Sequence, residues 1–370
     1  MTEDAGSIVT VDGRIDPSEL GVTLPHEHLS AWETEEQFDP PSSARERSIA
    51  REPLTLENRW YVRKNPSGVL ANRRIDPIDD AVPDVERFHR KGGDAIVDVS
   101  SKNHWRDPES ARAVARETGV TVVRGTSYYI RNSHPDWMDS TNVAELADEL
   151  VSDVRDGIDD TDVRAGIIGE VGLSTNHEQD GIHNQEKKVL RASARAAVRT
   201  GASITIHPPA RWREDRDPDM PSSRFGLEVV DIAEEEGLPA NRIVMGHLDQ
   251  SKSWLEDLTY QEQLADRGTV LEYDLFGHTN FMPGFADTQP SDPDRVQALL
   301  ELIESGYEEQ LLVSHDLYMK YLLSKYGGDG YRHILENVVP LLQDFGVDEE
   351  TVDQLLVENP ERVLTFEEPA

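Results

Sequence analysis

The stretch "VTLPHEHL" at residues 22–29 ends a short apolar run with two histidines, one residue apart, and a carboxylate between them. Its β-branched residues favour a strand. On a strand, residues two positions apart share a face and stand about 7 Å apart, whereas on a helix they point to different sides. We therefore predict that His26 and His28 face one side of a strand and that Glu27 faces the other.

Seven more short apolar runs follow this one, with helical stretches between them. A clear helix, "NQEKKVLRASARAAVRTG", ends at a glycine stop, Gly201. This alternation predicts an α/β fold with a parallel sheet, and eight βα units are typical of a TIM (β/α)8 barrel. A doubly wound open sheet is the alternative. The later runs are residues 95–101, 121–129, 165–173, 203–209, 243–249, 269–277 and 310–317.

The whole chain, residues 1–370, is interpreted as one barrel domain. Its first βα connection is unusually long, at about residues 30–94, and contains six prolines. Because "LTLENRWYVRKN" within it has regular apolar spacing, we predict a loop that packs over the barrel mouth and not a disordered linker. The end of the chain, "VDEETVDQLLVENPERVLTF", predicts two closing helices, with Pro360 at the start of the second.

The composition restricts the partners and the chemistry. A formal charge of -35 would repel nucleic acid and anionic membranes. No apolar run spans a bilayer and the start lacks the features of a signal peptide, so we expect a soluble, cytoplasmic protein with a small-molecule substrate. Only eight residues are lysine and the acidity is spread along the chain, as in adaptation to high salt. Without cysteine, any metal must be held by His, Asp and Glu.

Ionisable side chains follow the apolar runs, at the strand ends where TIM barrels place their active sites. An uncompensated ionisable group there would be costly. Four imidazoles and two carboxylates suit two divalent ions, with zinc first and manganese or cobalt as alternatives. The six candidate metal ligands are His26, His28, Glu170, His207, His247 and Asp316.

One ion is assigned to His26, His28 and Asp316. The other is assigned to His207 and His247, with Glu170 as the bridge between the two ions. Such ions lower the pKa of bound water, and Asp316 would take its proton and pass it to the leaving group. Each residue also has an ordinary structural alternative: a buried histidine with a hydrogen bond, a helix cap, or an arginine pair.

At this point the sequence resembles the phosphotriesterase-related proteins of the amidohydrolase superfamily. The motifs that carry the resemblance extend over nearly the whole chain: "LPHEHL", "GGDAIVDVS", "DGIDDTDVRAGIIGEVG", "TIHPPA", "VMGHLDQ", "LLVSHD" and "KYGGDGYRHIL". The resemblance implies a dinuclear barrel with the ligands named above, and a homodimer.

Two positions depart from patterns in that family. Gly169 stands where many members carry a carboxylated lysine, and the adjacent Glu170 resembles a branch that uses glutamate as the bridge. By strand alternation Glu170 should face outward, so a local bulge is needed to turn it inward. Leu275 stands where lactonase members carry an arginine after the aspartate of the seventh strand.

Three residues are candidate substrate contacts. Tyr129 matches a tyrosine that lies near the bridging solvent in lactonase members. His278 directly follows the seventh strand, and Lys320 in the eighth loop could bind an anionic group. His315, next to Asp316, should point away from the metals and is predicted to have a supporting role.

The predicted function is dinuclear metal-dependent hydrolysis of a small carbonyl substrate, a lactone or a carboxylic ester, by a metal-bridging hydroxide. The alternatives on the same site are hydrolysis of an amide or N-acyl compound and hydrolysis of a phosphotriester, because the fold does not choose among these bonds. An alternative of another class is a barrel that binds metal and ligand without catalysis.

Overall fold

Eight parallel strands form the barrel in the computed structural model, which describes residues 4–35, 37–102, 107–176, 181–210, 223–278 and 289–370. Each strand pairs with the next one along the chain. The strands are β3 (Thr23–Glu27), β6 (Ala95–Asp98), β7 (Thr121–Thr126), β8 (Ile167–Asn176), β10 (Ile204–Ala210), β11 (Ile243–Met245), β12 (Val270–Tyr273) and β13 (Leu311–Val313). All eight predicted strands are present, each with somewhat different bounds.

The barrel closes where β13 meets β3. The amide of Asp316 donates to the carbonyl of His26 at 3.1 Å, and the amide of His26 donates to Ser314 Oγ at 3.1 Å. In an open doubly wound sheet the first and last strands would not meet in this way. The TIM-barrel prediction is therefore confirmed.

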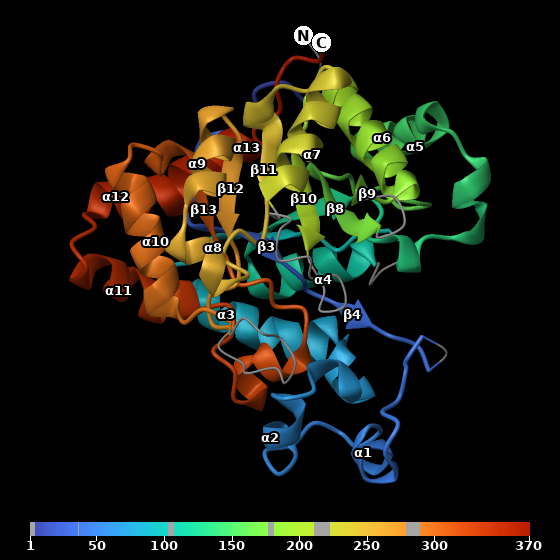
Figure 1. Ribbon diagram of the computed structural model, residues 1–370, viewed down its shortest axis with the longest axis vertical. Coiled ribbons are helices and arrows are strands. Elements are labelled where there is room, and N and C mark those ends of the chain that lie inside the picture. Colours follow the sequence, from blue (N-terminus) through green and yellow to red (C-terminus); the bar gives the residue numbers. More distant parts are fainter. Residues whose placement is uncertain (1–3, 36, 103–106, 177–180, 211–222, 279–288) are drawn as a thin grey trace.

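Helices surround the strands on the outside of the barrel (Figure 1). The predicted glycine stop is confirmed, because Gly201 caps α6 in a left-handed conformation with φ of 85°. None of the helices in the described ranges is long and apolar enough to cross a membrane. The outer helices are α4 (Pro108–Thr118), α5 (Val143–Arg155), α6 (Asn184–Thr200), α7 (Ser223–Glu235), α8 (Lys252–Glu256), α9 (Thr259–Asp266) and α10 (Asp292–Glu304).

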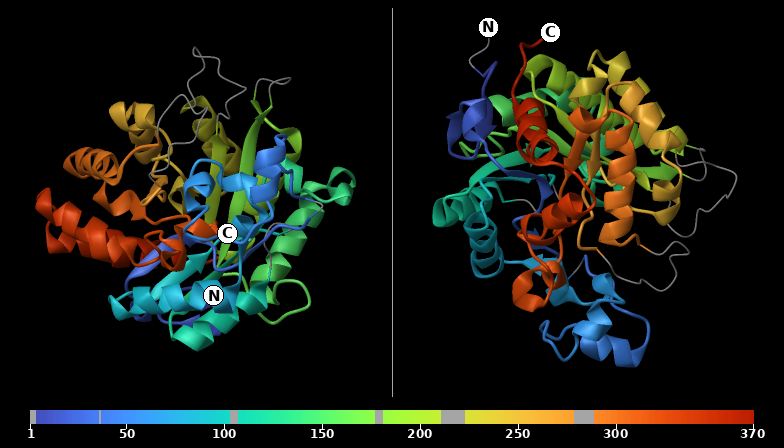
Figure 2. Two further views of the ribbon diagram at one scale, coloured as in Figure 1. Left: turned by 90° about the horizontal axis from the view of Figure 1, so that it is seen from below. Right: turned by 90° about the vertical axis from the view of Figure 1, so that its left-hand side faces the viewer.

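The two ends of the chain meet at the amino ends of the barrel strands. The first segment forms a hairpin of β1 (Ile8–Thr10) and β2 (Gly13–Ile15), and the last forms α11 (Val339–Asp344), α12 (Glu349–Asp353) and α13 (Asn359–Leu364). Ile8 and Leu364 pack in one cluster with Val97 and Val123 of the barrel strands. Phe366 exchanges backbone hydrogen bonds with Gly6 and Ser7, so both termini lie together (Figures 1 and 2).

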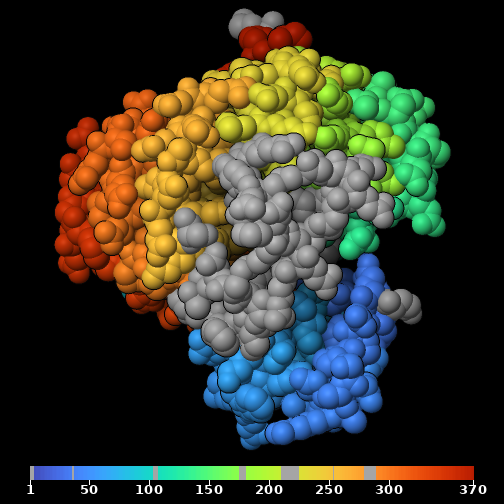
Figure 3. All heavy atoms as spheres, in the orientation of Figure 1, coloured from blue at the N-terminus to red at the C-terminus, as the bar shows by residue number. Residues whose placement is uncertain are grey.

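The long segment after β3 lies at the opposite end, toward which the strand arrows point (Figure 1). It forms a lobe that stands out below the barrel helices in the space-filling view (Figure 3). Asn72 accepts a hydrogen bond from the amide of Tyr321, so the lobe contacts the loop after β13. Its elements are β4 (Ala31–Trp32), α1 (Ala44–Ile49), α2 (Arg59–Val62), β5 (Arg74–Ile75), which pairs with β4, and α3 (Val82–Arg90).

Candidate metal centre

A register shift in β8 turns Glu170 toward the inside of the barrel. Ile204 of β10 pairs with Ile168, but Ile206 pairs with Val171, so three residues of β8 stand opposite two of β10. The amide of Glu170 donates to the carbonyl oxygen of Val99, the residue after β6, at 2.9 Å, and Glu170 is 3 % exposed. The bulge that the sequence required is therefore present.

Gly169 leaves no room for a side chain at the position that matches the family's bridging lysine. Its φ is +150°, and a Cβ atom there would lie 2.6 Å from the carbonyl oxygen of Thr205. A lysine at this position would require the neighbouring strand to move. Position 169 thus serves the bend of the backbone, and the adjacent carboxylate faces the site.

Gly169→Ala is expected to destabilise the protein for two reasons. The positive φ is unfavourable for alanine, and the clash of the added Cβ with Thr205 should cost about 1–3 kcal/mol more. Gly13→Ala is the control, since Gly13 has φ of +122° and nothing within 4 Å of the added Cβ. Denaturant unfolding of the metal-free proteins would measure both losses. Equal losses in the two variants would contradict the steric argument.

The first group of ligand atoms comes from β3, the residue that follows its end, and the loop after β13. His28 Nε2 lies 3.2 Å and His26 Nε2 lies 4.0 Å from Asp316 Oδ1. Ser100 Oγ donates to Asp98, so it accepts from His28 Nδ1 at 2.8 Å. The proton of His28 is therefore on Nδ1, and the Nε2 lone pair is directed toward Asp316.

The second group comes from β8, β10 and the end of β11. Glu170 Oε1 lies 2.9 Å from His207 Nδ1 and 3.1 Å from His247 Nε2, and these two nitrogens are 2.8 Å apart. Within each group the three ligand atoms lie within 4.8 Å of one another, and all the residues are buried. The structure thus brings the six predicted residues into two adjoining groups that are consistent with a binuclear metal site.

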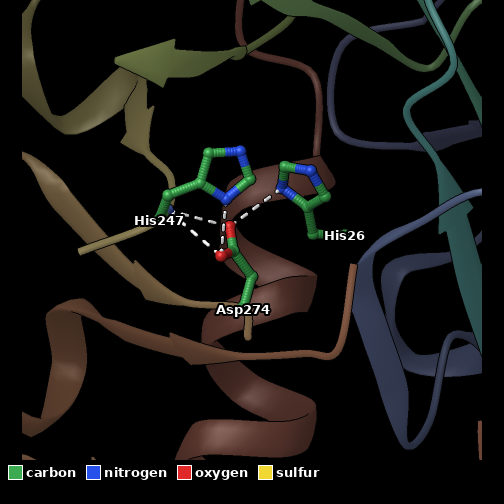
Figure 4. A group of neighbouring side chains, drawn as sticks. All are labelled: His26, His247 and Asp274. Atoms are coloured by element: carbon green, nitrogen blue, oxygen red, sulfur yellow. Dashed lines mark hydrogen bonds and ion pairs between the residues drawn. The ribbon is translucent and has the colours of Figure 1, made fainter. Parts of the chain in front are cut away.

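Two further carboxylates, Glu272 and Asp274 at the end of β12, hold the histidine rings in place. Asp274 lies between His26 and His247, 3.2 Å from Nδ1 of the first and 2.8 Å from Nδ1 of the second (Figure 4). Glu272 Oε2 is 2.8 Å from His26 Nδ1. Because the Nδ1 atoms are engaged, the Nε2 atoms of both rings are left for a metal.

Sequence reasoning missed Glu272 and Asp274 as site residues. The signal was present in "TVLEYDLFG", where two carboxylates are separated by one residue in an apolar strand. That is the same pattern that singled out His26 and His28. Applied to carboxylates as well as histidines, it would have found both residues.

The site fits divalent cations on the evidence of its own atoms. His26 Nε2 is buried and has no hydrogen-bond partner in the described part of the chain, although Glu170 Oε1 is 3.7 Å away. Burial lowers the pKa of His26, but Asp274 and Glu272 outweigh it and raise the pKa to about 10. Burial also lowers the pKa of His247, but Asp274 and Glu170 outweigh it and raise the pKa. Protons on His26 and His247 therefore balance buried carboxylates, and divalent ions would replace those protons.

The structure places the three candidate substrate contacts in different surroundings. Tyr129 Oη lies 3.3 Å from His207 Nδ1. His278 is 2 % exposed and stacks on Tyr318, and its Nε2 has no hydrogen-bond partner among the described residues. Lys320 Nζ pairs with the buried Asp80 at 2.7 Å, so its charge already has a partner.

Comparison with known proteins shows similarity along nearly the full length of the chain. A sequence profile of the phosphotriesterase family matches residues 6–364. The chain is 37% identical over 369 residues to an N-acetyltaurine hydrolase from Danio rerio, with 99% of this chain and 100% of the relative covered.

Two solved structures have a similar fold. One is a resiniferatoxin-binding protein from Rhodobacter sphaeroides, with a TM-score of 0.87 and 35% identity over 97% of this chain and 95% of that one. The other is a lactonase from Listeria monocytogenes, with a TM-score of 0.73 and 25% identity over 98% of this chain and 100% of that one.

Proposed function

The chain belongs to the phosphotriesterase family of metal-dependent hydrolases, and from this premise we propose that it hydrolyses the amide bond of a small N-acyl compound with an anionic end. The observation that carries the proposal is the full-length 37% identity to an N-acetyltaurine hydrolase. The sequence alone favoured a lactone or ester and gave amide hydrolysis as the alternative. The relatives favour that alternative.

The two groups of ligand atoms would each hold one divalent ion. We assign His26, His28 and Asp316 to the first ion and His207 and His247 to the second, with Glu170 between them. Zinc, manganese and cobalt all accept imidazole and carboxylate ligands. When bound, the ions would supply a water of lowered pKa and polarise the substrate carbonyl.

The proposed role of Asp316 is proton transfer. In amide hydrolysis the C–N bond breaks, the hydroxyl group of water goes to the acyl carbon, and the amine nitrogen must gain a proton as it leaves. Asp316 is 8 % exposed and its Oδ1 faces His28 and His26, so it can accept the proton of water and deliver it to the amine. Tyr129 and His278 are the proposed contacts to the substrate.

Arg73 of the lobe is the proposed partner of the substrate's anionic end. Burial, with the carboxylates of Glu170 and Asp316, raises the pKa of Tyr129, and the positive charge of Arg73 acts in the opposite direction. The pKa of Tyr318 is raised by burial to about 12, and Arg73 again opposes the shift. Arg73 pairs with Glu33 through Nε, and its guanidinium has two further nitrogens for the substrate's anion. Lys320, by contrast, has a single nitrogen, which Asp80 engages.

Lactone hydrolysis is the second candidate, supported by the similarity to the Listeria lactonase. Leu275 follows Asp274 where lactonase members carry an arginine, and its side chain is buried. That position therefore offers no cation or hydrogen-bond donor to a lactone. A barrel that binds without catalysis would not need the proton acceptor that Asp316 can provide.

A substrate panel tests the proposal. The metal-loaded protein is expected to cleave N-acetyltaurine with kcat/KM about 10- to 100-fold above that for N-ethylacetamide, which lacks the sulfonate, because a charge-assisted hydrogen bond contributes about 1.5–3 kcal/mol. The panel also contains γ-lactones, carboxylic esters and a phosphotriester, each assayed with chelator-treated protein as the control. Faster cleavage of a lactone or ester than of either amide would overturn the amide proposal.

A further inference from the structure

Glu27 is the last residue of β3 and stands between His26 and His28 in the sequence, and its side chain is fully buried. It crosses the seam between β3 and β13 and accepts hydrogen bonds from the loop that carries Asp316. Its Oε1 accepts from Ser314 Oγ at 2.8 Å and from the amide of His315 at 3.0 Å, and its Oε2 accepts from the amide of Leu317 at 2.9 Å.

The ring of His315 adds a fourth hydrogen bond to Glu27. His315 Nε2 accepts from the amide of Ile334 at 3.1 Å, so the proton of the ring is on Nδ1. This Nδ1 donates to Glu27 Oε1 at 2.7 Å. All four groups donate hydrogen bonds to Glu27. A carboxylate can accept all four, whereas an amide cannot, because its NH2 group is itself a donor.

These bonds hold the peptides on both sides of Asp316. Asp316 itself has φ of +50°, a left-handed conformation that is uncommon outside glycine and that Asp tolerates better than most residues. Its own amide donates to His26 O, in the residue before Glu27. Residues 314–317 are thus held by β3 on one side, while Ser314 also exchanges backbone hydrogen bonds with Tyr273 and Phe276 on the other.

We propose that Glu27 is a positioning residue that holds the Asp316 loop so that the carboxylate of Asp316 meets the Nε2 atoms of His26 and His28. A single tripeptide would then both supply two ligands of the first ion and orient the third. The inference rests on the proposed function only in that Asp316 is taken as a ligand and proton acceptor of this site.

Metal titration of Glu27→Gln tests the proposal without substrate. The amide keeps one oxygen but presents an NH2 group to a backbone donor of the loop. Of the two ions bound by metal-stripped protein, we expect one to be weakened about 10- to 100-fold and the other to be unchanged, because loss of a supporting residue reduces metal affinity by this factor. Asp316→Asn, titrated in parallel, identifies the ion that belongs to the first group.

Asp84→Asn is the matched control. Asp84 is also fully buried and accepts hydrogen bonds from the amide and hydroxyl of Ser324, farther along the same loop. It should lower the melting temperature as Glu27→Gln does but leave the affinity for both ions unchanged. Equal weakening of both ions by Glu27→Gln, or no weakening, would overturn the proposal.

His315→Phe is the second variant if Glu27→Gln does not fold, because the His315 ring is hydrogen bonded to Glu27 and to the amide of Ile334 and not to His26 or His28. It removes one donor to Glu27 and should weaken the same ion by a smaller factor. Unchanged affinity in this variant would also overturn the proposal. Wild-type protein that binds two ions but cleaves no amide would overturn the proposed function instead, because the titration of Glu27 variants needs no turnover.

Discussion

Glu170→Ala is expected to retain at most one tightly bound divalent ion per chain and to lose more than about 100-fold in turnover. Removal of a residue that only supports a metal ligand costs up to about 100-fold, and removal of a ligand should cost more. One carboxylate oxygen lies within 3.1 Å of His207 and His247 and 3.7 Å from His26, so it faces ligands of both groups. Removing its charge would also leave two cations with less compensation between them.

Elemental analysis after dialysis, together with kcat on the best substrate of the panel, would measure both effects. Glu186→Ala is the control, because Glu186 is fully buried and accepts from the amide of Arg131 but belongs to neither ligand group. It should cost stability and still retain two ions. Two ions and near-normal turnover in Glu170→Ala would show that Glu170 does not bridge them.

Asp316→Asn is expected to lower kcat by about 10²- to 10⁴-fold at saturating metal, the range for a lost general acid or base. The asparagine oxygen can still bind a cation, so excess metal fills the site while the proton acceptor is missing. The assay therefore separates proton transfer from metal binding.

The control for Asp316→Asn is the metal content of the same sample, which should reach that of the wild type. Turnover unchanged at full metal occupancy would remove Asp316 from the mechanism. If neither the wild type nor Asp316→Asn hydrolyses any compound, the alternative of a barrel that binds metal and ligand without catalysis is favoured.

The barrel could be predicted because each parallel strand is covered on both sides and appears in the sequence as a short apolar run. The bounds of the strands could not be predicted in the same way. The run 310–317 contains only three strand residues, Leu311–Val313, because Ser314 and the next residues leave the ladder to place Asp316. Short elements of the lobe, such as α1 with six residues, depend on tertiary contacts and leave no periodic pattern to detect.

The ligands could be predicted from their place after apolar runs, but their orientation could not. Strand alternation assigns Glu170 to the outer face, and only the three-to-two register between β8 and β10 reverses this. The side of β3 that carries Glu27 was predicted correctly. Its partners in the last loop could not be predicted, because they are 287 to 290 residues away in the chain and meet Glu27 only when the barrel closes.

The pairing of the two chain ends at the amino ends of the strands has a practical consequence for handling the protein. Phe366 is hydrogen bonded to Gly6 and Ser7, while the ligand groups lie at the other ends of the strands. An affinity tag or a surface linker at either end would therefore leave the ligand groups on the side of the barrel that faces away from the support. The same proximity would let a short peptide join the ends, so that new termini could be opened elsewhere.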